Sequence, residues 1–504
     1  MARLATRWLV LVLGLSAPVA RAQGPTMPAP YRLAPPPLPP GLVLTLEDAL
    51  QLARHNNPAY LETIVARRTS AANLRAAWGG LFPQLNANYQ AAYVGPGLQT
   101  FGGEQLGSNS PYDFSQYQLN LTYTLSANTL FTPKFEIANH KAAESDIDQA
   151  SATLRAQVTQ QYLLVLQDQV LGHLQDTLIA DDSVQLLLAS ARAAAGAATQ
   201  LDVQRAQVTL TQQQVNAVQA HNTTDIALLQ LFQQIGIPQP FGVELQDTFV
   251  IVAPPLTLDS ALNLARTQNP ALLALRAREH AANADVMRQR GLYAPVLQVA
   301  TGVSGQAIQY TNQNYVPGIY EAQYQQTYAS CIALDSVGLA AGLPPRNCGS
   351  PNLSAQQIAA LKASNNQFPF KFQNVPRQIS ATLSIPIFDG FQRERSVEIA
   401  TANRQNAEYN IRARELQLTA DVTTAYLNVT TAIKTASLNE QNAAAARQSL
   451  ALAEERYRVG AATYVDVTDS RAAFVRAETD RINSVFIYHS QFAALESAVG
   501  RPLR

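Results

Sequence analysis

The sequence predicts a mainly helical protein in which one unit, ordered helix, strand, strand, helix, turn, helix, occurs twice. Three observations predict this fold: two similar segments far apart in the chain, short stretches of alternating polar and apolar residues, and long runs without Gly or Pro. Long runs with apolar residues at steps of three and four are typical of coiled-coil hairpins. Period-two alternation is typical of strands that bury one face.

The chain carries an internal duplication. The segment LTLEDALQLARHNNPAYL at 44–61 matches LTLDSALNLARTQNPALL at 256–273, at an offset of 212 residues. Further along, GAAT at 196–199 matches GAAT at 460–463, at an offset of 264 residues, so the second half holds 52 additional residues. A duplication of this length indicates a two-fold repeat rather than a solenoid. The predicted first repeat, linker and second repeat lie at 44–238, 239–255 and 256–504.

The N-terminus predicts export from the cytoplasm. Two arginines precede the apolar run WLVLVLGL, and small residues stand at Ala20 and Ala22, before a cleavage site for signal peptidase. We therefore expect a signal peptide over 1–22. A membrane anchor is the alternative, but the apolar run is too short to span a bilayer. Residues 23–43 are rich in Pro and indicate an extended segment.

Four stretches alternate between apolar and polar residues and predict strands. In the second of them, Tyr117, Leu119 and Leu121 are apolar, whereas the residues between them are polar. This pattern suits a half-buried sheet, and it equally suits a membrane barrel with lipid on one side and water on the other. Open sheet edges are not tolerated in lipid, so four strands would serve in a membrane only if several chains completed one barrel. The predicted strands lie near 84–94, 116–125, 296–306 and 378–387.

Three long runs predict the helices that follow the strands. Residues 391–459 and 461–499 contain neither Gly nor Pro, and the first repeat has a matching run at 197–235. Ala dominates the spaced apolar positions of the second repeat, so we expect neighbouring helices to approach closely and to bury little area per turn.

The same turn joins the long helices of each repeat. In the second repeat, Gly460 can adopt the left-handed conformation that ends a helix. Thr463 can then cap the next helix together with Asp466, three residues on. Capping does not explain Asp469, because aspartates three residues apart repel unless they face water or bind cations. The equivalent positions of the first repeat are Gly196, Thr199 and Asp202.

These features together resemble the TolC-type outer-membrane efflux channels. The resemblance rests on the duplicated LTLxxALxLAxxxNP openings, on PIFDG at 386–390 and on YRVGAATYVDVTD at 457–469, and it covers nearly all of the chain after the signal peptide. The first repeat departs from it, since YTLSANTLFTP replaces PIFDG. The resemblance implies a homotrimer in outer-membrane lipid. Its barrel would have twelve strands, four from each chain, and its helices would form a tunnel across the periplasm.

The resemblance also implies roles for residues at the helix tips. Positions matching Asp466 and Asp469 form acidic rings at the periplasmic entrance, and positions matching Tyr457 and Asp202 belong to links that hold the tips closed. Ala462 stands where the family can place an Arg, so we expect that link to be missing here. A periplasmic adaptor protein docks at the tips. The tip residues in this chain are Gly196, Thr199, Gly460, Thr463 and Val465.

The implied function is the exit channel of a tripartite efflux system, which passively conducts small molecules from an inner-membrane pump through the adaptor. One alternative is the outer-membrane channel of a type I protein secretion system. Another, of a different class, is a soluble periplasmic coiled-coil scaffold. The six His are scattered, with no HExxH motif, so we expect no enzyme, cofactor or metal site. Zero net charge without a basic stripe argues against a nucleic-acid partner.

The additional residues of the second repeat predict an inserted loop over about 307–376, which faces the cell exterior in the family's topology. This loop holds the two Cys of the chain, Cys331 and Cys348. Two nearby Cys in an oxidising compartment usually pair. We expect a disulfide that stiffens a lid-like loop without contributing to the barrel; two free thiols are the alternative.

Overall fold

A computed structural model describes residues 41, 43–101, 104–240, 242–246 and 250–503. The predicted signal peptide and nearly all of the Pro-rich segment lie outside these residues. The chain is mainly helical and forms two compact units. Among the described residues, none of the helices combines the length and the apolar character needed to cross a bilayer. The first unit comprises the chain up to Val65, Ser145–Leu273 and Arg414–Arg504, and the second comprises Ala66–Glu144 and Ala274–Ala413.

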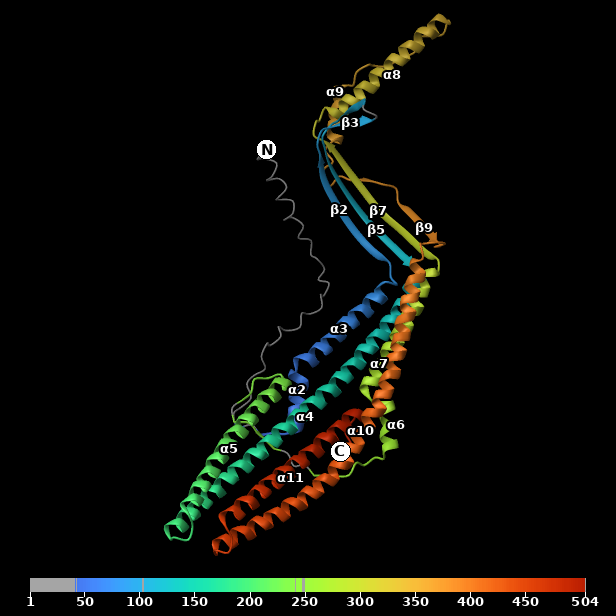
Figure 1. Cartoon of the computed structure of the whole chain (residues 1–504). Helices are drawn as coiled ribbons and strands as arrows, with labels where there is room; N and C mark the ends of the chain where they lie inside the picture. The colour runs from blue at the N-terminus through green and yellow to red at the C-terminus, as the bar shows by residue number, and fades with distance from the viewer. Residues whose placement is uncertain (1–40, 42, 102–103, 241, 247–249, 504) are drawn as a thin grey trace. The chain divides into compact units, whose positions relative to one another are not determined.

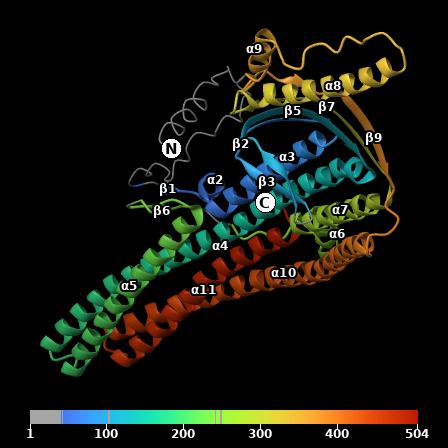
Figure 2. The same ribbon diagram turned by 90° about the horizontal axis from the view of Figure 1, so that it is seen from above.

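Two helical hairpins dominate the first unit. In one, α4 (Ala127–Ala194) is followed by α5 (Gln200–Ile235); in the other, α10 (Gln392–Arg458) is followed by α11 (Tyr464–Val499). Two views show α5 beside α4, α4 beside α11, and α11 beside α10 (Figures 1 and 2). The side chain of Gln167 on α4 donates a hydrogen bond to Asn483 on α11 at 2.8 Å, which agrees with this order.

A repeated Asn-Pro motif divides a helix in each repeat. In the first repeat it separates α2 (Leu46–Asn56) from α3 (Pro58–Gly79), and in the second it separates α6 (Leu258–Gln268) from α7 (Pro270–Arg290). The residue before a proline is disfavoured in the helical conformation, and both Asn residues are extended, with ψ near 118° to 119°.

The side chains of these two Asn join the short helices to the hairpins. Asn57 Nδ2 donates to the carbonyl of Gln234 at 2.6 Å, and Asn269 Nδ2 donates to the carbonyl of Ala498 at 2.9 Å. Gln234 and Ala498 lie in the last turns of α5 and α11, where carbonyls lack partners within the helix. The duplicated motif therefore caps the ends of both hairpins by the same contact.

The largest apolar core of the first unit lies where α2, α4 and α5 meet. Tyr162, Leu231 and Phe232 are almost completely buried there, together with Leu50. The hydroxyl of Tyr162 donates to the carbonyl of Leu44 at 2.8 Å, so this large side chain is buried without leaving its polar atom unpaired. Leu44 belongs to β1 (Val43–Leu44), which pairs in parallel with β6 (Glu244–Leu245).

The second unit contains an antiparallel sheet in the order β2, β5, β7, β9. The strands overlap the stretches where the alternation predicts them, although β5 and β7 are longer than expected and β9 ends earlier than expected. The short β8 (Gln373–Asn374) also pairs with β7. The bounds of the four long strands are Gln84–Val94, Tyr112–Leu125, Val296–Tyr310 and Gln378–Ser384.

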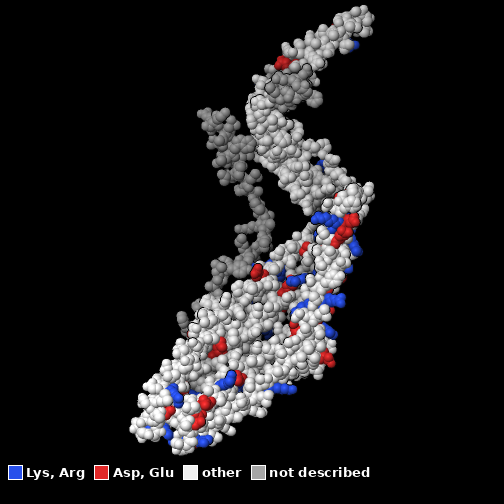
Figure 3. Space-filling view, in the orientation of Figure 1, with Lys and Arg blue, Asp and Glu red and all other residues white. Residues whose placement is uncertain are grey.

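The strand register aligns side chains of one kind across the sheet. Leu85 lies opposite Leu121, and Thr301 lies between Leu121 and Ile379. The neighbouring row is polar or small and consists of Asn86, Asn120, Gly302 and Gln378. Asp113 is the charged residue of these four strands, and their surface is almost free of blue and red in Figure 3. The sheet therefore has one apolar and one polar face.

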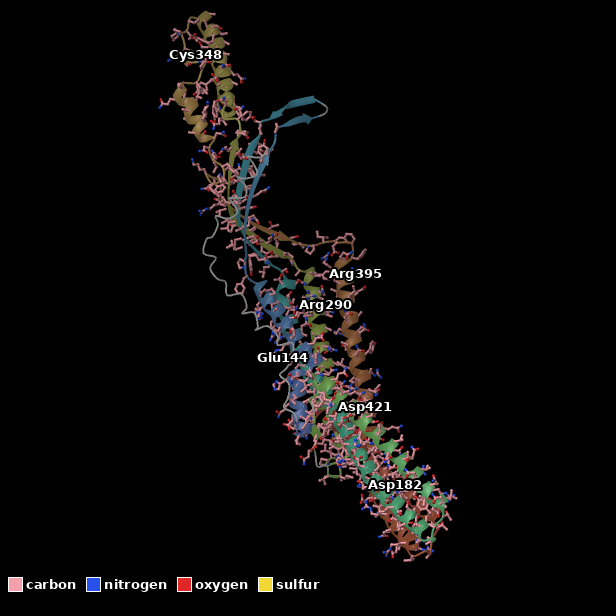
Figure 4. All side chains as sticks on the ribbon, turned by 90° about the vertical axis from the view of Figure 1, so that its left-hand side faces the viewer. Glu144, Asp182, Arg290, Cys348, Arg395 and Asp421 are labelled. Atoms are coloured by element: carbon pink, nitrogen blue, oxygen red, sulfur yellow. A yellow bond between two sulfur atoms is a disulfide. The ribbon has the colours of Figure 1, made fainter. Side chains whose placement is uncertain are left out.

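The insertion of the second repeat is not the plain loop that we expected. It contains α8 (Tyr315–Ala340) and α9 (Ala355–Ser364), because residues 319–337 lack Gly and Pro and include several good helix formers. Cys331 on α8 forms a disulfide with Cys348, which is labelled in Figure 4. The connection between β2 and β5 in the first repeat likewise contains a small hairpin, β3 (Gly97–Phe101) and β4 (Glu104–Asn109).

Candidate functional site at the hairpin tips

The two tip turns are built from the same local contacts. Gly196 and Gly460 have φ of +74° and +80°, in the left-handed region that ends a helix. Beyond Gly460, the backbone N–H of Thr463 donates to Asp466 Oδ2 at 2.8 Å, and the N–H of Asp466 donates to Thr463 Oγ1 at 3.2 Å. Thr199 and Asp202 form the same reciprocal cap. The capping boxes predicted from the sequence are confirmed.

These caps hold negative charge at the tips. The hydrogen bond from the backbone of Thr463 lowers the pKa of Asp466, and the equivalent bond from Thr199 lowers the pKa of Asp202. Both carboxylates also lie at the positive end of a helix dipole. Asp469 is exposed and forms no hydrogen bond or ion pair with another described residue. The carboxylate of Asp466 is thus engaged in its cap, whereas that of Asp469 faces solvent.

An apolar cluster beneath the turns joins the two hairpins. Tyr457 at the end of α10 is 3% exposed and packs with Tyr464 and Val467 of α11. The rings of Tyr457 and Tyr464 lie 5.8 Å apart in an edge-on arrangement. Ala189 of α4 and Ala206 of α5 complete the cluster, so all four hairpin helices contribute to it. In contrast, Val465 is exposed and belongs to the outer surface of the tip.

Arg192 is a site residue that the sequence did not reveal. Its guanidinium donates to the carbonyls of Tyr457 and, at 3.0 Å, Arg458, and it donates to the carbonyl of Ala197 at 3.3 Å. It also lies 4.6 Å from the centre of the Tyr457 ring, within the range of a cation–π contact. A single side chain of the first hairpin therefore binds the last carbonyls of α10, where a cation is favourable.

The absence of the arginine link from position 462 stays a prediction. Ala462 provides none, but Arg192 brings a guanidinium to the same turn from the opposite hairpin. The buried hydroxyl of Tyr457 has no hydrogen-bond partner among the described residues, and Asp202 instead bonds to Thr199. Tyr457 and Asp202 therefore do not bond to each other within this chain. Arg192 stands four residues before Gly196, and Arg456 stands four residues before Gly460. This shared spacing is visible in the sequence, but it does not reveal that Arg192 binds backbone carbonyls.

Comparisons with known proteins agree with this architecture. The model of the family described as outer membrane efflux protein matches residues 49–237 and 348–501, which include both tips. The unmatched interval between these ranges contains α8. No match is found among curated proteins.

Solved outer-membrane channels share the fold at low sequence identity. OprN has a TM-score of 0.68 and 16% identity, over 91% of this chain and 90% of its own. VceC from Vibrio cholerae has a TM-score of 0.65 and 14% identity, over 91% and 97%. CmeC from Campylobacter jejuni has a TM-score of 0.68 and 14% identity, over 90% and 85%.

Proposed function

This chain belongs to the outer membrane efflux protein family, and we propose that it is the outer-membrane exit channel of a tripartite efflux system. In this function three copies form one channel, which passively conducts small molecules delivered by an inner-membrane pump through a periplasmic adaptor. The helical hairpins line the periplasmic part, and the strands lie in the outer membrane.

The four-stranded sheet is the observation that carries this proposal. Apolar side chains of its strands are widely exposed; Leu85 is 63% and Ile379 is 78% accessible in the single chain. β2 and β9 each pair with a described strand on one side only. A soluble scaffold would leave this apolar face and both edges in water, which favours aggregation. In the proposed channel, lipid covers the apolar face, and strands of neighbouring copies pair with the two edges.

The hairpin tips supply a plausible entrance for cargo. Asp466 and Asp469 project from the start of α11, and three copies would place six carboxylates around one narrow opening. Walls of low dielectric constant focus the field of such charges, so cations are favoured at the mouth. The surface around Gly196, Thr199, Gly460, Thr463 and Val465 is then the docking site for the adaptor.

Conductance of the purified protein in planar bilayers tests the entrance. We expect a cation-selective channel whose selectivity falls when both carboxylates are neutralised in the double variant Asp466→Asn/Asp469→Asn. Asn at position 466 keeps an oxygen that can accept the bond from Thr463, so the cap is retained. Unchanged selectivity in this double variant would refute the acidic entrance.

A matched control is Glu455→Gln, which removes an exposed acidic charge that is already paired with Arg458 at 2.7 Å. We expect its selectivity to equal that of the wild type. The trimer is checked separately by electrophoresis in detergent before and after heating. A monomeric, detergent-independent protein would contradict the channel itself and favour the scaffold.

A further inference from the structure

A buried ion pair joins the two hairpins beneath the apolar tip cluster. Arg471 Nε on α11 lies 2.8 Å from Asp182 Oδ1 on α4, and the two side chains are 8% and 4% exposed. Arg471 Nη2 also donates to the carbonyl of Leu178, one turn before Asp182, at 3.0 Å. Figure 4 labels Asp182 within the packed hairpin helices. Arg471 therefore binds both the side chain and the backbone of the opposite hairpin.

This pair does not serve stability in an obvious way. Burial raises the pKa of Asp182 above its ordinary value, although the charge of Arg471 acts in the opposite direction. When folding raises the pKa of a carboxyl group, the ionised carboxylate lowers the stability of the folded state relative to the unfolded state. Buried pairs of this kind are often no better for stability than apolar residues of similar volume, and their best-attested role is to select one arrangement of helices.

The other contacts between the hairpins do little to select one arrangement of the helices. The seam contains small residues such as Ala189 and Ala206, whose contacts change little when helices slide. Gln167 with Asn483, and Gln185 with Glu454, also connect the hairpins, but these bonds are only partly buried and water competes for them. Arg471 and Asp182 form a contact between the hairpins in which both side chains are buried, so the loss of one partner would leave the other charge without water.

We propose that Arg471 and Asp182 set the register of the two hairpins, so that the turns at Gly196 and Gly460 meet and Arg192 reaches the end of α10. Both residues are positioning residues, since neither lies at the exposed tip. The proposal rests on the proposed channel only for its consequence, a correctly formed mouth. The register itself is a property of the hairpins and is measured without conductance.

Cysteine cross-linking tests the register directly. The two native Cys are bound to each other, so introduced cysteines provide the free thiols. Gln167→Cys with Asn483→Cys reports the observed register, whereas Gln167→Cys with Asp480→Cys or Ile487→Cys reports a slide of one turn in either direction. We expect the observed pair to cross-link at least about tenfold faster than the shifted pairs, because one turn displaces a side chain by roughly 5.4 Å.

The decisive variant is Asp182→Leu/Arg471→Met, which removes both charges of the pair together. Glu454, whose pKa is raised by burial and lowered by the charge of Arg471, keeps its hydrogen bond from Gln185 in this variant. We expect the double variant to fold, with an unfolding temperature close to that of the wild type, while the shifted pairs cross-link nearly as fast as the observed one. Arg471→Lys, which keeps the charge but not the forked contact, should give an intermediate ratio. Cross-linking confined to the observed pair in the double variant would overturn the proposal.

A control separates register from any loss of buried charge. Glu478 on α11 is also buried, but it pairs at 2.8 Å with Arg481 of the same helix and faces Arg447 of the same hairpin. Glu478→Gln should therefore leave the cross-linking ratio at the wild-type value. If it shifted the ratio as much as the double variant does, the effect would be general loosening and the assignment of Arg471 and Asp182 would be wrong.

Discussion

Two pairs of glycines in this chain share a left-handed backbone but differ in their surroundings. At the tips, a Cβ added to Gly196 would meet nothing within 4 Å, and one added to Gly460 would meet only the guanidinium of Arg192, at 3.8 Å. Glycine is needed there for its conformation alone.

The glycines at the other ends of α5 and α11 are enclosed. Gly236 and Gly500 have φ of +87° and +94°. A Cβ at Gly236 would lie 2.4 Å from the carbonyl oxygen of Asn56, and one at Gly500 would lie 2.7 Å from Pro270 Cδ. These glycines are needed for conformation and for space, because the Asn-Pro motif packs directly against them. The comparison teaches that equal backbone angles do not imply equal tolerance of substitution.

The largest expected effect is at the enclosed glycines. Gly236→Ala and Gly500→Ala should each destabilise the protein by about 2–5 kcal/mol, since the left-handed conformation costs roughly 1–2 kcal/mol and a methyl group forced into packed backbone adds about 1–3 kcal/mol. The measurement is the unfolding temperature by circular dichroism at one fixed heating rate. A wild-type unfolding temperature would show that the Asn-Pro segment moves away without cost.

A smaller loss of stability is expected when the Asn of the Asn-Pro motif, rather than the glycine that it packs against, is replaced. Asn269 is 3% exposed, so Asn269→Ala removes a buried donor from the carbonyl of Ala498 and should cost about 1–3 kcal/mol. Asn57 is more exposed, so Asn57→Ala should cost less despite its shorter bond. Equal losses in the two variants would contradict the importance of burial. The same thermal measurement decides this.

Tip glycines should tolerate a methyl group far better. Gly196→Ala and Gly460→Ala should cost about 1 kcal/mol each, the strain of a left-handed alanine without a clash. Trimer yield after extraction in detergent should match that of the wild type. A fall in unfolding temperature comparable to that of Gly500→Ala would mean that the tips carry a packing constraint absent from the single chain.

The smallest expected effect is the pH dependence contributed by the tip residue Asp466. The pKa of Asp466 is lowered by folding, so its stabilising contribution is complete above the unfolded value of about 3.9 and is lost as pH falls through the lower folded value. The difference in unfolding temperature between wild type and Asp466→Asn should therefore shrink between about pH 5 and pH 3. Gly236→Ala should show no such convergence. If the unfolding temperatures of wild type and Asp466→Asn differed by the same amount at every pH, this account would be wrong.

Local chemistry made much of the fold predictable. The turns follow from Gly, Thr and Asp at fixed spacing, and each contact of the cap joins residues three positions apart. The strands follow from a period of two over about ten residues, and the helices follow from runs without Gly or Pro. In each case the residues that determine the structure are neighbours in the chain.

Contacts between distant residues were not predictable. Arg192 binds backbone carbonyls far along the chain, and backbone acceptors leave no trace in the sequence. Arg471 and Asp182 look like ordinary surface charges until the hairpins pack and bury them. The helix α8 was missed for another reason: the insertion was expected to be one continuous loop, although its residues 319–337 contain neither Gly nor Pro.

The centre of the sheet has a consequence for how the chain is made. β5 comes from the first repeat and β7 from the second, and they pair from Tyr112 with Tyr310 to Leu125 with Leu297. As synthesis proceeds from the N-terminus, β2 and β5 emerge long before β7. During that interval β5 presents an unpaired edge and the sheet an uncovered apolar face, both of which recruit other chains. The first half of the sheet therefore stays open to association with other chains until the second half of the polypeptide arrives.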